Sequence, residues 1–328
     1  MTLLTLQDVS VRYPLAGRAS FAAVDRVSLE LAPGETLAIV GESGCGKSTL
    51  GRAIVGLTPR SSGIMTWRGR DVSSFDRAAR HALKRRIQII FQDPLASLDP
   101  RMTVAEAVAE PLDIFEPMMS RAARGRRVTE MLDQVELPAA TADRLPHAIS
   151  GGQCQRVAIA RAMILGPELL VCDEAVSALD VSVQAQIVNL LQRLQRETDL
   201  GLIFISHGLS VVRHLSHRVA VLYLGRVVET GPIETVFTRP AHPYTRALLS
   251  AVEIPDPIAA RARQRIILAG DPPSPVNPPS GCVFRTRCKE AMAICAERAP
   301  ALTSTGPGAQ VACHQHQPSS QTGASDLF

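Results

Sequence analysis

Residues 41–48 read GESGCGKS, and this segment limits the possible folds more than any other part of the chain. It fits the pattern G-x-x-x-x-G-K-[S/T], a loop between a strand and a helix whose backbone N–H groups surround nucleotide phosphates. The apolar run at 36–40 and the helical pattern at 50–57 supply that strand and helix. A chance glycine-rich turn is the alternative. The residues expected to contact the nucleotide are Gly41, Ser43, Gly44, Cys45, Gly46, Lys47, Ser48 and Thr49.

The chain has 328 residues, which is room for about two domains. Its 46% apolar and 20% charged content is ordinary for a folded protein. No run approaches the roughly 18 apolar residues that span a bilayer. The first residues also lack the basic and apolar regions of a secretory signal. We therefore expect a cytosolic chain, or one docked on the cytosolic side of another component.

The net charge of +4 would permit a nucleic-acid partner. However, the arginines are spread along the chain, and no basic run alternates with aromatic residues. The densest basic clusters lie at 84–86 and 121–127, and we interpret both as solvated helix faces. The sequence therefore predicts no nucleic-acid partner.

An apolar run at 169–172 ends in two carboxylates, Asp173 and Glu174. At a strand end beside the phosphate loop, Asp173 would hold Mg²⁺ through water, and Glu174 would act as general base on the attacking water. Ser48 is the second expected Mg²⁺ ligand. An acidic pair could instead cap the following helix, but its combination with the phosphate loop favours the catalytic interpretation.

A Ser-Gly-Gly turn leads into a predicted helix at 150–162 and forms a second potential anion site. The residues concerned are Ser150, Gly151, Gly152 and Gln153. Because the chain has one phosphate loop, this second site is expected to serve a nucleotide held elsewhere.

Together these motifs resemble those of ATP-binding cassette (ABC) proteins. Residues 150–153 resemble the signature motif, and Tyr13 is placed like the aromatic residue that stacks on adenine. Gln92 matches the glutamine of the Q-loop, which contributes to the Mg²⁺ site. Asp180 matches the D-loop, and His207 matches the switch histidine. The motifs occur in family order between residues 13 and 207, so the chain is identified as a member of this family.

The resemblance implies a particular assembly. Two cassettes dimerise head to tail, and ATP lies between the phosphate loop of one and the signature motif of the other. Ser150 and Gly152 would then contact the partner's nucleotide, while His207 would contact the γ-phosphate and support the water activated by Glu174. Gln92 would link the Mg²⁺ site to residues 93–100, on the surface that faces the membrane partner. One cassette is present, so the second is expected on another chain.

The expected fold class is an α/β P-loop ATPase with a RecA-like core, a helical signature subdomain and a C-terminal cysteine-rich extension. We place the nucleotide-binding domain at 1–255, its helical subdomain at about 94–160 and the extension at 256–328. Residues 4–11 alternate like a half-buried edge strand. Residues 271–280 are too rich in proline for a regular helix or a central strand. Residues 315–328 are expected to be disordered.

Three positions depart from the family pattern. Ala175 replaces a common proline, and we regard this change as harmless. Cys154 replaces a long polar residue, and we interpret it as a solvent-facing substitution. Gly208 replaces an aspartate after the switch histidine, which would loosen the turn that carries His207.

The C-terminal part narrows the family. The segment HPYTRALL at 242–249, the proline-rich stretch and GCVFRTRC at 281–288 resemble ATP-binding subunits of oligopeptide/dipeptide importers. This resemblance implies a peripheral subunit on the cytoplasmic face of the inner membrane that drives peptide uptake. Its partners would be a second, related ATPase subunit, two permeases and an extracytoplasmic solute-binding protein. An importer of nickel or another small solute is the alternative.

Four late cysteines, spaced C-x5-C-x6-C-x17-C, are candidate metal ligands: Cys282, Cys288, Cys295 and Cys313. Four thiolates suit an iron–sulfur cluster or a structural zinc, and the C-x2-C pairs typical of zinc ribbons are missing. The family resemblance implies a [4Fe–4S] cluster, with zinc or free thiols as alternatives. Cys45, Cys154 and Cys172 are interpreted as small buried or incidental residues.

Other classes fit less well. DNA-repair ATPases of this kind carry long insertions between loop and signature, whereas about a hundred residues separate the two here. Translation-factor ATPases carry two cassettes in one chain. A pure binding module would not need both Asp173 and Glu174.

Overall fold

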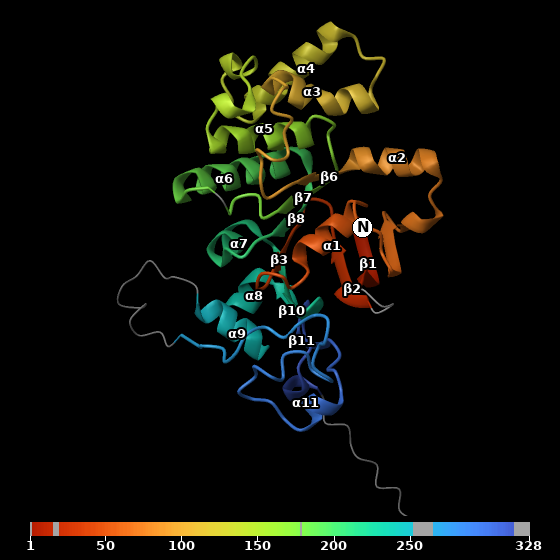
Figure 1. The fold of residues 1–328 in the computed structure, drawn as a ribbon, viewed down its shortest axis with the longest axis vertical. Coiled ribbons are helices and arrows are strands. Elements are labelled where there is room, and N and C mark those ends of the chain that lie inside the picture. Colours follow the sequence, from red (N-terminus) through yellow and green to blue (C-terminus); the bar gives the residue numbers. More distant parts are fainter. Residues whose placement is uncertain (1, 16–19, 178, 252–264, 318–328) are drawn as a thin grey trace, which may run out of the picture.

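The computed structural model describes residues 2–15, 20–177, 179–251 and 265–317. Its described strands form two sheets (Figure 1). The smaller sheet consists of β1 (Leu4–Pro14), β2 (Ser20–Leu31), β4 (Ser62–Trp67) and β5 (Arg70–Asp71). These strands pair antiparallel in the order β2-β1-β4-β5.

The larger sheet carries the sequence motifs. Its strands are β3 (Thr36–Val40), β6 (Ile87–Ile90), β7 (Leu169–Asp173), β8 (Gly201–Ile205), β9 (Arg218–Tyr223), β10 (Arg226–Pro232), β11 (Thr303–Gly306) and β12 (Ala309–Val311). The order is β11-β12-β10-β9-β3-β8-β7-β6, and the five strands from β9 to β6 are parallel. Every residue of β3, β7 and β8 is buried. Such continuous apolar strands are typical of a parallel sheet covered on both faces.

The helices cover the larger sheet and extend it at one end. They are α1 (Lys47–Ile54), α2 (Arg77–Arg86), α3 (Val104–Phe115), α4 (Arg121–Gln134), α5 (Gly151–Met163), α6 (Val181–Thr198), α7 (Leu209–Leu215), α8 (Ile233–Thr238), α9 (Pro243–Ser250) and α11 (Ile294–Glu297). Figure 1 shows α3, α4 and α5 grouped at one end of the molecule and α11 at the opposite end. α3 and α4 lie within residues 94–160, the predicted helical subdomain, and α5 begins in it and ends at Met163.

Local sequence explains where several helices begin. Thr103 and Glu106 form a capping box at the start of α3, in which each side chain accepts a hydrogen bond from the other's backbone N–H. Ser150 and Gln153 form the same arrangement at the start of α5. Asp180 caps α6 by accepting from the N–H of Val183 at 2.9 Å.

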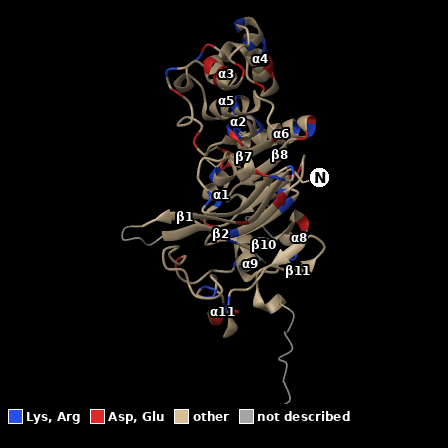
Figure 2. Cartoon of the chain, turned by 90° about the vertical axis from the view of Figure 1, so that its right-hand side faces the viewer, with Lys and Arg blue, Asp and Glu red and all other residues tan. Residues whose placement is uncertain are grey.

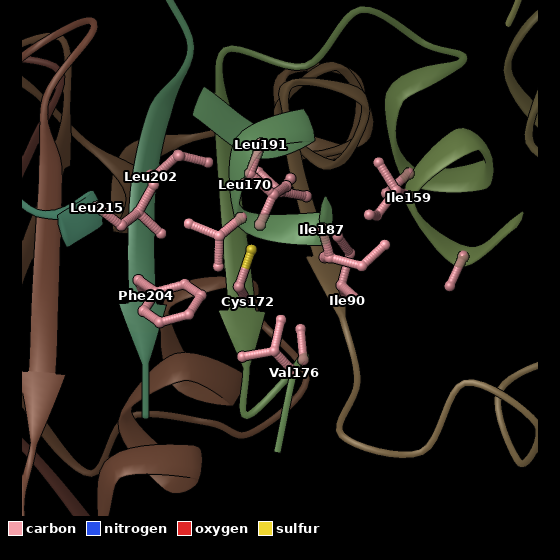
Figure 3. Packing of buried hydrophobic residues seen from close by; sticks show 14 of the residues in the cluster. Ile90, Ile159, Leu170, Cys172, Val176, Ile187, Leu191, Leu202, Phe204 and Leu215 are labelled. Atoms are coloured by element: carbon pink, nitrogen blue, oxygen red, sulfur yellow. The ribbon is translucent and has the colours of Figure 1, made fainter. Parts of the chain in front are cut away.

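The main core packs α5, α6 and α7 against one face of the larger sheet. Figure 3 shows Leu170 and Cys172 of β7 next to Leu202 and Phe204 of β8, with Ile187 of α6 on the other side of β7. All five side chains are fully buried. A second apolar cluster joins the opposite face of the larger sheet to α1 and the smaller sheet.

The C-terminal segment adds strands to the larger sheet. β12 pairs antiparallel with β10, and β11 pairs with β12. Residues 271–280 form turns and irregular structure, as their proline content predicts. The predicted disordered tail and the proposed boundary at 255/256 fall largely or wholly outside the described residues.

The basic clusters lie on helix surfaces, as predicted. Figure 2 shows the charged residues of α2 and α4 on the outside of the molecule. α2 has no buried residue, and residues 121–127 are exposed or half-buried. None of the helices in the described part is long and apolar enough to cross a membrane.

Two expectations were wrong. β1 lies between β2 and β4 and is therefore an interior strand of its sheet. Its alternation reflects one buried face, a pattern that interior and edge strands of a half-covered antiparallel sheet share. Cys154 is fully buried, and its thiol donates a hydrogen bond to the Pro146 carbonyl at 3.5 Å. It lies on the face of α5 that enters the core, so it is not a solvent-facing substitution.

We expect Leu202→Ala to lower the free energy of unfolding by about 2–5 kcal/mol, because it leaves a cavity between β8 and its covering helix. Leu57→Ala is the matched control, since Leu57 is 59% exposed. That change should cost less than about 0.5 kcal/mol. Urea denaturation of both variants tests this, and equal losses would show that the core is not where the structure has it.

Candidate functional site

The phosphate loop lies between β3 and α1, and Lys47 is the first residue of that helix. The lysine side chain is 5% exposed. Its Nζ donates to the carbonyl of Gly41 at 2.9 Å and to that of Glu42 at 3.0 Å. The loop thus curves around the lysine ammonium, as the motif predicts.

Gly46 explains why the loop needs glycine. Its φ is +102°, in a region that side chains disfavour, and a Cβ there would lie 2.1 Å from the Ala23 carbonyl oxygen. The loop therefore passes directly against β2. Larger residues at position 46 would move the start of α1.

The parallel strands bring the acidic pair to the loop. Asp173 lies at the end of β7, and the Ser48 hydroxyl donates to its Oδ1 at 2.7 Å. Burial raises the pKa of the Asp173 carboxyl, while the hydrogen bond from Ser48 acts in the opposite direction. Two hard oxygen ligands thus stand side by side, which suits Mg²⁺.

Glu174 faces both the loop and the end of β8. One carboxylate oxygen lies 4.0 Å from Lys47 Nζ, and the other lies 3.6 Å from His207 Nδ1. Its backbone is left-handed at φ +50°, and its N–H donates to the Ile205 carbonyl at 3.0 Å. A non-glycine residue in this conformation is strained by about 1–3 kcal/mol, a feature that clusters at functional sites.

A cavity of about 350 Å³ opens above the loop. Predicted site residues that line it are Tyr13, Ser43, Gly44, Gly46, Lys47, Ser48, Thr49, Gln92 and Glu174. Tyr13 and Glu174 are the first and last of these residues in the chain, and they lie far apart in sequence. The fold therefore gathers one aromatic residue, the loop and the proposed base around one space.

Other predicted residues lie elsewhere. The cavity lining does not include Ser150, Gly151, Gly152 or Gln153. Ser150 and Gly151 are exposed at the start of α5. His207 is also largely exposed, at 62% of its side chain. The signature residues are thus presented to the outside rather than to the loop of their own chain.

Gly208 does not leave the His207 turn open. Its φ of −81° is accessible to any residue, and its N–H donates to the Ser206 hydroxyl at 2.9 Å. Ser206 therefore closes the turn locally. Asp180 has a local role as well, since Ser182 and Val183 donate to its carboxylate and lower its pKa.

Sequence reasoning missed part of the cavity wall. Phe21, Ala22 and Ala23 of β2 line it, together with Leu224 and Gly225 of the β9–β10 turn and Pro275. Phe21 packs against Tyr13 with ring centroids 5.7 Å apart. An aromatic residue near Tyr13 was a weak signal, whereas nothing in the sequence points to Pro275.

The four late cysteines are free thiols in one part of the fold. Burial raises the pKa of Cys282, and the nearby Cys295, Cys313 and Cys288 raise it further. The thiols are thus close enough to influence one another. Within the described ranges, however, no three His, Cys, Asp or Glu side chains are arranged to hold a metal ion. The iron–sulfur and zinc predictions are therefore not confirmed.

Comparison with known proteins first shows which class of protein this chain belongs to. Residues 24–177 match the family model described as ABC transporter, and residues 228–295 match the one described as oligopeptide/dipeptide transporter, C-terminal region. A dimeric structure of the cassette MJ0796 in a post-hydrolysis state with ADP and Pi covers 70% of this chain and 99% of its own, with a TM-score of 0.64 at 30% identity. Fold and phosphate loop thus define an ABC-type ATPase.

Curated relatives narrow the class. The oligopeptide transport ATP-binding protein OppF of Escherichia coli (strain K12) is 53% identical over 92% of both chains. The putative oligopeptide transport ATP-binding protein YkfD of Bacillus subtilis (strain 168) is 49% identical over 97% of this chain and 96% of its own. The chain belongs to the family of ATP-binding subunits of oligopeptide/dipeptide ABC transporters. Such subunits are ATPases coupled to transport, so the DNA-repair, translation and pure binding classes do not apply.

We expect Gly46→Ala to weaken ATP binding at least about tenfold, or ~1.4 kcal/mol. The added methyl group would clash with the Ala23 carbonyl, so the loop would have to move away from β2. The alanine would also have to adopt a φ that side chains disfavour. Gly125→Ala is the control, because Gly125 lies within α4 and its added Cβ meets nothing within 4 Å. Calorimetric titration with ATP measures both, and unchanged affinity in Gly46→Ala would contradict the predicted role of the loop.

Proposed function

We propose that this chain binds and hydrolyses ATP to energise the import of di- and oligopeptides through an ABC transporter. The arrangement of Lys47, Ser48 and Glu174 around one cavity, with Asp173 hydrogen-bonded to Ser48, carries the ATPase part of this proposal. The similarity to oligopeptide transport ATP-binding proteins over nearly the whole chain supports the peptide cargo.

The phosphate groups of ATP would bind in the loop. The N–H groups of residues 43, 44 and 46–49 would donate to them, and Lys47 would neutralise charge on the β- and γ-phosphates. Tyr13, which lines the same cavity, would stack on the adenine. Ser48, Gln92 and Asp173 would hold Mg²⁺, an ion that neutralises charge on the β- and γ-phosphate oxygens when bound.

Glu174 is the proposed general base. Its carboxylate would take a proton from the attacking water, and His207, 3.6 Å away, would orient that water and contact the γ-phosphate. Lys47 Nζ lies 4.0 Å from the other carboxylate oxygen, so the proposed base stands between the loop lysine and the histidine.

Ser150, Gly151, Gly152 and Gln153 would complete the site of a second cassette, and Asp180 would lie at the same interface. The exposed start of α5 supports this role, because the N–H groups of Gly151 and Gly152 lie outside the capping box and the Ser150 hydroxyl can still donate its hydrogen to an anion. We propose that the second cassette is a related subunit, which gives a heterodimer.

The membrane partner would dock beside Gln92. A cavity of about 180 Å³ lies there between β6, α3 and α5, lined in part by Phe91, Ile114 and Arg161. Ile114 in this lining is 58% exposed, and Leu95, three residues after Gln92, is 50% exposed, so both present apolar side chains to a partner. Two permease subunits at this surface, working with an extracytoplasmic solute-binding protein, would hold the chain at the cytoplasmic face of the membrane.

We propose the domain division predicted above: a nucleotide-binding domain at 1–255 with a helical subdomain at about 94–160, followed by an extension at 256–328. The helices between 104 and 163 support the subdomain. The match of residues 228–295 to a separate C-terminal family region supports a distinct extension.

We expect Glu174→Gln to reduce ATP hydrolysis by the assembled transporter about 10²–10⁴-fold while ATP still binds, because it removes the base without removing volume. Glu234→Gln is the control, since the Glu234 side chain is 65% exposed on α8 and pairs with Arg213. Hydrolysis in Glu174→Gln at the wild-type rate would rule out Glu174 as the base.

The same assembled complex distinguishes the cargo. Peptide-loaded binding protein should stimulate hydrolysis, and labelled peptide should enter vesicles that contain the transporter. A complex stimulated by nickel-loaded binding protein and not by peptides would identify the alternative importer.

We keep the four-cysteine site as a [4Fe–4S] prediction, with zinc as the alternative. Its support is the placement of two of these cysteines side by side, since the Cys282 backbone N–H donates to the Cys295 carbonyl at 2.8 Å. Protein purified without oxygen should contain about four irons per chain. Cys282→Ser should remove the iron, whereas Cys154→Ser, in the core of the helical end, should not. Stoichiometric zinc without iron, or neither metal, would contradict the cluster.

A further inference from the structure

Glu42 is the first variable residue of the phosphate loop, and all three of its polar groups are held. Its carbonyl accepts from Lys47 Nζ at 3.0 Å. Its backbone N–H donates to the Tyr244 hydroxyl at 2.8 Å. Its carboxylate accepts two hydrogen bonds from Arg287, at 2.7 and 3.2 Å. Two of these three anchors come from the C-terminal part of the chain.

The Arg287 contact is a forked ion pair, with one guanidinium nitrogen on each carboxylate oxygen. The arginine side chain is 8% exposed and that of Glu42 is 28% exposed. The residues are 245 positions apart in sequence. A pair in this setting is poorly screened by water, so removing one partner leaves the other charge unpaired.

The surroundings hold Arg287 in place. Its N–H donates to the Phe284 carbonyl at 3.0 Å, within the turn between Cys282 and Cys288. The Phe284 ring packs against Tyr223 and Tyr244, with centroids 5.2 and 5.4 Å apart. Arg287 is therefore tied through Phe284 to the aromatic cluster of Tyr223, Tyr244 and Phe284, whose Tyr244 bonds to the loop.

We infer that Arg287 is a positioning residue of the nucleotide site: by holding Glu42, it fixes the loop in the shape that binds the phosphates. The peptide at Glu42 is one of the two that accept from Lys47, so its orientation sets where the lysine ammonium lies. This inference rests on the proposed ATP site, and it extends that site to a residue near the C-terminal end of the chain.

We expect Arg287→Met to weaken ATP binding to the purified full chain about tenfold, or ~1.4 kcal/mol. Arg287→Lys should recover part of the loss, because it keeps the charge but not the fork. Arg285→Met is the matched control: Arg285 lies on the same turn, and its side chain donates to Ser280 and not to the phosphate loop. It should change affinity less than about twofold. Titration with ATP measures all three.

A second measurement separates positioning from general stability. In the assembled transporter, Arg287→Met should raise KM for ATP about tenfold and leave kcat nearly unchanged, as expected when binding alone is lost. Backbone amides of residues 41–48 should exchange faster in this variant without nucleotide. A fall in kcat with unchanged KM would indicate loss of folded protein and overturn the inference.

If Arg287→Met does not fold, Glu42→Gln decides, because it weakens the pair from the loop side and leaves the C-terminal turn intact. Wild-type affinity in Glu42→Gln would overturn the inference. Failure of the wild-type chain to bind ATP would instead overturn the proposed function. Tight ATP binding by the wild type with equal affinity in Arg287→Met would overturn the positioning role alone.

Discussion

The parallel pairing of β3, β7 and β8 is the constraint on which the site depends. In the register of these strands Ile39 lies opposite Ile205, and Ile205 lies opposite Asp173. Because parallel strands end at the same edge of a sheet, the segments that follow them emerge together. The phosphate loop, the acidic pair and His207 are those segments. The side chains of these segments approach one another to 2.7–4.0 Å because the strands pair in this way, although the segments are distant in sequence.

The end of the larger sheet formed by β10, β12 and β11 has a different role. β10 and β12 extend it antiparallel, and α9 and the turn at 282–288 pack next to them. The buried carboxylate of Glu229 on β10 accepts hydrogen bonds from the N–H groups of Ala241 and His242, and these bonds fix the start of α9. Tyr244 on α9 then reaches Glu42 of the loop. The C-terminal part of the chain is thus built into the wall behind the nucleotide site.

Sequence patterns worked best where the structure is local. The loop at 41–48, the Ser-Gly-Gly turn that leads into α5, and the buried runs of β3 and β7 each follow from consecutive residues. Sequence patterns failed where the position of a residue depends on segments that are distant in the chain. Alternation in β1 could not reveal which strands flank it, and a cysteine after the signature motif could not reveal which face of α5 it occupies. Both depend on packing between distant segments.

By itself the sequence determined the chemistry available to this protein: a lysine and glycines that suit phosphate, carboxylates that suit magnesium and water, and a serine-glycine turn that suits a second anion. Tertiary structure alone decided which of these groups meet. It joined Ser48 to Asp173 and Arg287 to Glu42 across 125 and 245 residues, and it kept the start of α5 away from the loop. The physical reason is that residue type sets what a side chain can bind, whereas sheet order and packing set its distance from the others.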